Sequence, residues 1–121
     1  MNTILIIIQI VIALSILDVW VLRYNKKTKY RGGDAKSIKE EFAVYGLPAW
    51  FMFFIGITKV TLAVLLIVGV WIPILTAPAA GILAILMFGA ILMHVKIKDS
   101  IIKTLPALIM FVLSFTLALL A

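Results

Sequence analysis

The sequence of 121 residues contains no cysteine and only one histidine, and each scarcity excludes a class of chemistry. Without cysteine the chain forms no disulfide, no iron–sulfur cluster and no thiolate zinc site. One histidine is too few for a bis-histidine haem site, and no residue spacing suits a three-ligand zinc site. We therefore expect no metal site, no cofactor held by this chain alone and no catalytic residues of its own.

Charged residues are also scarce, at 13% of the chain, whereas hydrophobic residues make up 65%. A soluble domain typically has about 25% charged and about 45–50% apolar residues. A chain this short cannot bury so much apolar surface within itself. The composition predicts one integral membrane domain over residues 1–121.

Four apolar runs are long enough for helices that cross a bilayer, which takes about 20 residues. Open strands are excluded because lipid offers no partner to unpaired backbone groups. The first run lacks a basic leader and outlasts a signal peptide's apolar core, so we expect a retained helix. Pro73 and Pro78 predict a hairpin between the second and third spans. The expected fold is an all-α, four-helix membrane bundle with spans at residues 3–22, 50–72, 78–95 and 104–121.

One polar segment, the basic loop 23–47, separates the first two spans. Ser37 and Glu40 fit a capping box at the start of a helix. Apolar side chains then recur on one helical face, at Ile38, Phe42 and Tyr45. The pattern predicts a short amphipathic helix in the membrane interface. The alternative is an ordinary solvated loop.

Basic residues gather on one side of the predicted bundle. Ten of the eleven lie in the first and third loops, and Lys59 is the exception. The positive-inside rule places these loops in the cytoplasm and both termini outside, in a plasma or inner membrane. This placement explains the net charge of +6, so no nucleic acid is expected as a partner. Anionic lipid is the expected contact of four residues in the first loop: Lys26, Lys27, Lys29 and Arg31.

Three ionisable residues inside the spans, Asp18, Lys59 and His94, are the candidate site. A charge within a transmembrane helix is costly and usually faces the bundle interior or water. Asp18 and Lys59 lie at similar depths and lean towards each other, which predicts an ion pair. His94 either completes the cluster or pairs with Asp18. The cluster is either a site for a polar head group or a proton, or a purely structural pair.

Several other residues carry structural predictions. Asp99 and Ser100 are typical N-cap residues for the fourth span. Three tryptophans near span ends are predicted interface anchors: Trp20, Trp50 and Trp71. Small residues of the third span predict close helix packing: Ala80, Gly81, Ala84 and Gly89.

Beyond these patterns, the order and spacing of several short runs resemble the DoxX-like family. The runs are Gly46 to Trp50, Gly56 to Lys59, Leu65 to Gly69 with Pro73, and Met87 to Ile91 followed by His94 and Asp99. The resemblance covers about residues 40–110 and implies a small four-helix membrane protein. Family members are similar to a quinone-linked thiosulfate-oxidising subunit of some archaea and to an animal receptor-assembly chaperone. They often place Glu or Lys at the position of Lys59.

Three functional hypotheses follow. The first is a non-enzymatic accessory or assembly protein that binds a lipid-like or quinone-like ligand or a partner membrane protein. The second, implied by the resemblance, is a membrane subunit of a quinone-linked oxidoreductase complex whose metal or flavin belongs to a partner. The third is a small proton-coupled transporter, suggested by Asp18, Lys59 and His94.

Overall fold

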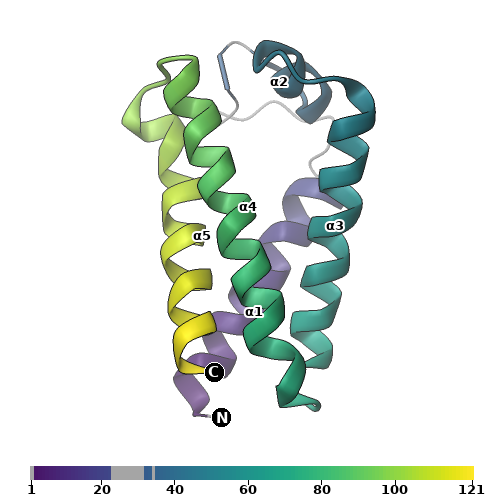
Figure 1. Ribbon diagram of the computed structural model, residues 1–121, viewed down its shortest axis with the longest axis vertical. Coiled ribbons are helices and arrows are strands. Elements are labelled where there is room, and N and C mark those ends of the chain that lie inside the picture. Colours follow the sequence, from purple (N-terminus) through teal and green to yellow (C-terminus); the bar gives the residue numbers. More distant parts are fainter. Residues whose placement is uncertain (1, 23–31, 34) are drawn as a thin grey trace.

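Four long helices stand side by side in the computed structural model, which describes residues 2–22, 32–33 and 35–121. Both termini lie at one end of the bundle, and a short helix lies across the other end (Figure 1). The helices, in chain order, are α1 (Thr3–Leu17) with its π-helical continuation η1 (Asp18–Leu22), α2 (Ile38–Val44), α3 (Ala49–Val68), the 3₁₀ turn η2 (Pro73–Leu75), α4 (Thr76–Lys96) and α5 (Ile101–Leu120). The predicted all-α bundle of four apolar helices is confirmed.

The four long helices form a closed ring in which α1 and α4 each contact both α3 and α5 (Figure 1). Between 11% and 33% of each span is buried inside the bundle, so most of the apolar surface faces outward. Water would not tolerate so large an apolar exterior, whereas lipid does. The chain is therefore a multi-pass membrane protein.

The turn between α3 and α4 brings the second and third spans together as the predicted hairpin. The helix α3 ends at Val68, short of the predicted boundary, because the chain turns at Gly69. A Cβ atom at Gly69 would lie 2.5 Å from the Thr76 hydroxyl, so the turn needs glycine there. From α1, the fully buried Gln9 side chain donates to the Leu66 carbonyl and, over 3.1 Å, to the Thr76 hydroxyl. An amide thus ties the first helix to the hairpin.

The short helix α2 forms as its capping signals predict. Glu40 N donates to the Ser37 hydroxyl over 3.2 Å, and Gly46 follows the helix with a φ of +79°. Ile38 and Tyr45 are buried against the bundle, so the amphipathic face points inward. The alternative of an ordinary solvated loop is wrong over Ile38–Val44, while the helix's place in the membrane interface stays a prediction. The predicted anionic-lipid contacts fall outside the described residues: Lys26, Lys27, Lys29 and Arg31.

Candidate functional site

A cavity of about 730 Å³ lies between the helices at the end that α2 covers. All four long helices and α2 contribute to its walls, which are predominantly apolar. Its volume falls within the range of about 300–1,000 Å³ that is common for small-molecule sites. Five acidic or basic side chains interrupt the apolar lining: Asp18, Glu41, Lys59, His94 and Lys103.

The three residues predicted as a cluster, Asp18, Lys59 and His94, all line this one cavity. Among the described residues, however, Asp18 and Lys59 do not form the predicted ion pair with each other. Lys59 instead places its ammonium 5.5 Å from the centre of the Trp20 ring, a cation–π contact. A role of the cluster in ligand binding stays a prediction.

The contact between Lys59 and Trp20 has a local cause in the winding of the first helix. The chain switches from α to π winding at Asp18–Leu22, where Trp20 lies. The Trp20 ring then covers Gly56 so closely that a Cβ there would lie 2.6 Å from a ring carbon. Because Gly56 is three residues before Lys59, the same helical face carries both, and the ring meets the lysine.

Trp20 therefore differs from the other two predicted interface anchors. Its ring meets Phe42 of α2 edge-on, with 6.1 Å between the ring centres, and it lines the cavity. Trp50 and Trp71 are 70% and 77% exposed, outside the cavity. Trp20 is thus part of the candidate site.

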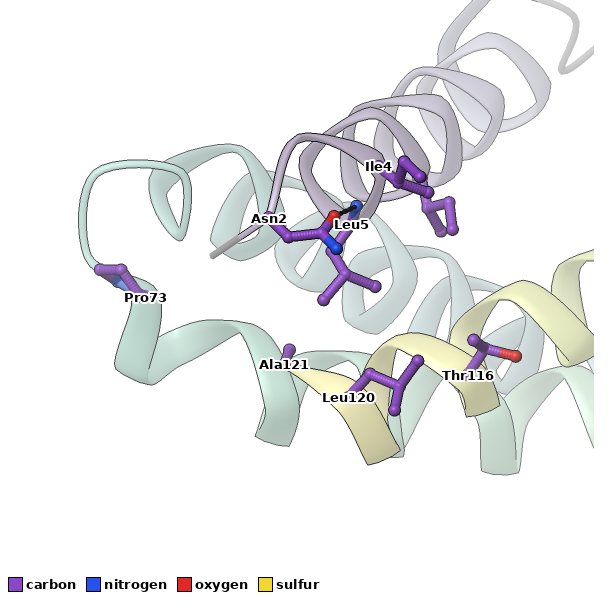
Figure 2. Close-up of a pocket in the computed structure, with 8 residues that line it drawn as sticks. Asn2, Ile4, Leu5, Pro73, Thr116, Leu120 and Ala121 are labelled. Atoms are coloured by element: carbon purple, nitrogen blue, oxygen red, sulfur yellow. Dashed lines mark hydrogen bonds between the residues drawn. The ribbon is translucent and has the colours of Figure 1, made fainter.

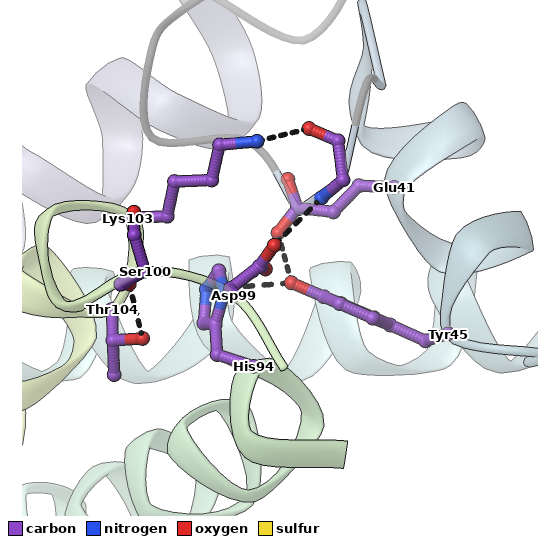
Figure 3. A network of polar contacts seen from close by, with 8 residues as sticks. Glu41, Tyr45, His94, Asp99, Ser100, Lys103 and Thr104 are labelled. Atoms are coloured by element: carbon purple, nitrogen blue, oxygen red, sulfur yellow. Dashed lines mark hydrogen bonds and ion pairs between the residues drawn. The ribbon is translucent and has the colours of Figure 1, made fainter. Parts of the chain in front are cut away.

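A network of polar side chains, which we call the polar clasp, joins α2 to the end of α4. It comprises Glu41, Tyr45, His94 and Asp99 (Figure 3). The Tyr45 hydroxyl donates to Glu41 Oε1 over 2.6 Å and lies 3.4 Å from His94 Nε2. On the other side of the ring, His94 Nδ1 lies 2.6 Å from Asp99 Oδ2. The clasp holds α2 over the cavity.

Three further hydrogen bonds strengthen the attachment of this end of the bundle. Asp99 Oδ1 accepts a hydrogen bond of 3.1 Å from Gly33 N, and Lys103 donates to the Gly33 carbonyl. Lys96 donates to the Tyr45 carbonyl over 2.9 Å. Gly33, which precedes α2, and Tyr45, at the end of α2, are therefore both bound to the adjoining ends of α4 and α5 and the turn between them.

The prediction of Asp99 as an N-cap residue is wrong. The cap position before α5 belongs to Ser100, whose side chain makes no capping hydrogen bond. Asp99 is drawn back towards His94 by a Schellman motif, in which Asp99 N donates to the His94 carbonyl over 2.9 Å. Lys98 occupies the left-handed position of that motif with a φ of 56°. Nothing in the hydropathy pattern signals this reversal.

The small residues of α4 have two different roles. Ala80 and Ala84 are buried in the helix interface, as predicted for close packing. Gly89 lines the cavity, and a Cβ atom added to it would have no neighbour within 4 Å. The close packing predicted at Gly89 is therefore not found, and this glycine instead keeps the cavity wide.

A second, smaller hollow of about 570 Å³ lies at the terminal end, between the start of α1 and the end of α5 (Figure 2). Its lining carries no ionisable side chain, and Asn2 uses its oxygen to cap α1 at Leu5 N over 3.1 Å. The cavity under α2, with its charged groups inside apolar walls, is the stronger candidate for a site.

The fold and the cavity define a class of protein: a small multi-pass membrane protein with a cavity between its helices, lined by apolar and ionisable side chains. The sequence model of the DoxX-like family matches residues 31–117, which make up most of the chain. This chain belongs to the DoxX-like family. No curated protein and no solved structure matches it. The family match covers Lys59 and the polar clasp, whereas α1 and η1 precede it, and η1 carries Asp18 and Trp20.

Proposed function

We propose that this DoxX-like protein is a non-enzymatic accessory protein of the membrane that binds a lipid-like or quinone-like ligand in the cavity under α2. The observation that carries the proposal is the combination of a cavity of about 730 Å³ with apolar walls and the largely buried Lys59 on one wall. Apolar walls suit a hydrocarbon chain or ring, and a few polar groups fix its orientation.

The charge distribution supports an orientation for the site. The described basic residues of the two loops lie at the α2 end of the bundle: Lys36, Lys39, Lys96, Lys98 and Lys103. By the positive-inside rule, this charge favours a cytoplasmic location for that end and for the cavity. Both termini are then outside. Anionic lipid stays the predicted contact of Lys26, Lys27, Lys29 and Arg31, and near an anionic leaflet each basic residue would contribute about 1 kcal/mol of attraction.

The position of Gly89 allows a direct test. Gly89→Phe places a ring in the cavity without a clash at its Cβ, and an α-helix tolerates the exchange because glycine is a poor helix former. Ile82→Phe is the matched control, since Ile82 lies on the same helix and faces outward. Both variants and the wild type are purified from native membranes, and their bound small molecules are identified by mass spectrometry.

We expect one amphipathic molecule to accompany the wild type and Ile82→Phe but not Gly89→Phe. Equal amounts on all three proteins would mean that the molecule binds outside the cavity. A partner membrane protein that co-purifies with a ligand-free wild type would support an assembly role and contradict the ligand-binding proposal.

A further inference from the structure

We infer that the ligand of the cavity is an anionic amphiphile, an acyl or alkyl chain with a carboxylate or phosphate head, and that Lys59 binds the head. The inference rests on the proposed function and adds the charge and orientation of the ligand. It is based on the hydrogen bonds and ion pairs that Lys59 lacks and that the other charged groups of the cavity wall make.

Lys59 has unused hydrogen-bonding capacity. Its side chain is only 9% exposed, and its ammonium carries three donors. Within the described part of the chain, Lys59 contacts the Trp20 ring and is attracted by the charge of Glu41 on the same wall, but it makes neither a hydrogen bond nor an ion pair. A cation in such surroundings is costly unless an anion reaches it, and a bound anionic head would supply that anion.

The other ionisable side chains of the wall are engaged. Glu41 accepts from Tyr45, and His94 is held between Tyr45 and Asp99. Lys103 donates to the Gly33 carbonyl, and Asp18 takes part in an interaction as well. Among the ionisable groups that line the cavity, Lys59 is thus the one that a ligand head can bind without displacing a protein partner.

The cavity also provides a path for an apolar tail. Val19 of η1 and Leu105 and Ile109 of α5 line the cavity and are also 40%, 41% and 49% exposed. The cavity therefore reaches the outer, lipid-facing surface between α1 and α5. Lys59 is ten residues into α3, about 15 Å along the helix at 1.5 Å per residue. A head bound at Lys59 inside the bundle leaves its tail to run towards this opening.

Trp20 serves as a built-in reporter because it touches Lys59 and lines the cavity. The sequence has three tryptophans, so Trp50→Phe with Trp71→Phe leaves Trp20 as the only one. The full chain is placed in nanodiscs of zwitterionic phosphatidylcholine. Quenching of Trp20 fluorescence is then titrated with dibromostearic acid and with its neutral methyl ester.

We expect saturable quenching by the acid at concentrations about tenfold or more below those for the ester, as a charge-assisted hydrogen bond predicts. Lys59→Met should remove this advantage and Lys59→Arg should retain it. Alkyl phosphate and alkyl carboxylate of equal chain length then compete with the bromo-acid. Stronger competition by the phosphate assigns a phosphorylated lipid, and stronger competition by the carboxylate assigns a free fatty acid.

Equal quenching by acid and ester in the wild type would overturn the inference, and this comparison needs no Lys59 variant. The proposed function would survive that result if Gly89→Phe abolished quenching by both probes. If Gly89→Phe left both titrations unchanged, the cavity would not be a ligand site, and the proposed function would fail as well.

Discussion

Substitution of Asp99 tests whether the polar clasp stabilises the α2 end of the bundle. Its side chain is 6% exposed and accepts two hydrogen bonds, from His94 Nδ1 over 2.6 Å and from Gly33 N over 3.1 Å. Asp99→Ala leaves the buried His94 ring and the half-buried Gly33 N without that partner. A hydrogen bond to a charged group contributes about 1.5–3 kcal/mol, and an orphaned buried donor costs about 1–3 kcal/mol. We expect Asp99→Ala to lower the free energy of unfolding by about 2–4 kcal/mol.

Ser100→Ala is the matched control for Asp99→Ala. The Ser100 side chain makes no capping hydrogen bond, so its loss should change stability by less than about 0.5 kcal/mol. A working N-cap would instead cost about 1 kcal/mol. The assay is thermal unfolding in detergent, followed by circular dichroism. Equal losses of stability in the two variants would mean that both residues act as helix caps. The polar clasp would then contribute nothing to the stability of the bundle.

Three further predictions concern separate parts of the bundle. Gln9→Leu should destabilise the bundle by about 1 kcal/mol, the usual size of an interhelical hydrogen bond in a membrane. Ser114→Ala is the control and should be neutral, because the buried Ser114 hydroxyl has no partner among the described residues. Equal losses of melting temperature in the two variants would contradict this prediction. Gly56→Val should displace the Trp20 ring and shift its fluorescence emission, since a Cβ at Gly56 would lie 2.6 Å from that ring, and an unchanged spectrum would contradict the packing. In this cysteine-free chain, a cysteine at the exposed Ala43 of α2 should react with an impermeant maleimide only after the cell membrane is opened, and reaction in intact cells would reverse the proposed orientation.

The membrane bundle is predictable from the sequence because its determinants are local. A bilayer fixes the length of an apolar helix, so hydropathy alone locates the four long helices to within a few residues. The helix α2 is equally local, since Ser37 and Gly46 mark its ends. The hairpin turn follows from Pro73 for the same reason.

The details of the candidate site depend on tertiary contacts that no spacing rule contains. Depth along the helices brings Asp18 and Lys59 to the same cavity, but the π-helical turn rotates Trp20 onto Gly56 and gives Lys59 a ring as its neighbour. Asp99 has the sequence signature of a helix cap, and only the left-handed Lys98 turns it towards His94.

Gln9 was detectable in principle. A single amide in an otherwise apolar span commonly marks a hydrogen bond between membrane helices. The acceptor of this hydrogen bond, Thr76, is not detectable in the same way, because only the folded hairpin brings it next to Gln9.

The most direct test of a ligand site in this bundle is an experimental density map of the protein purified from its native membrane without added lipid. We expect an elongated density in the cavity under α2, with one end within hydrogen-bonding distance of Lys59 Nζ and the other between Val19 and Ile109. A cavity filled only by rearranged protein side chains, or density confined to the terminal hollow beside Asn2, would contradict the proposed function.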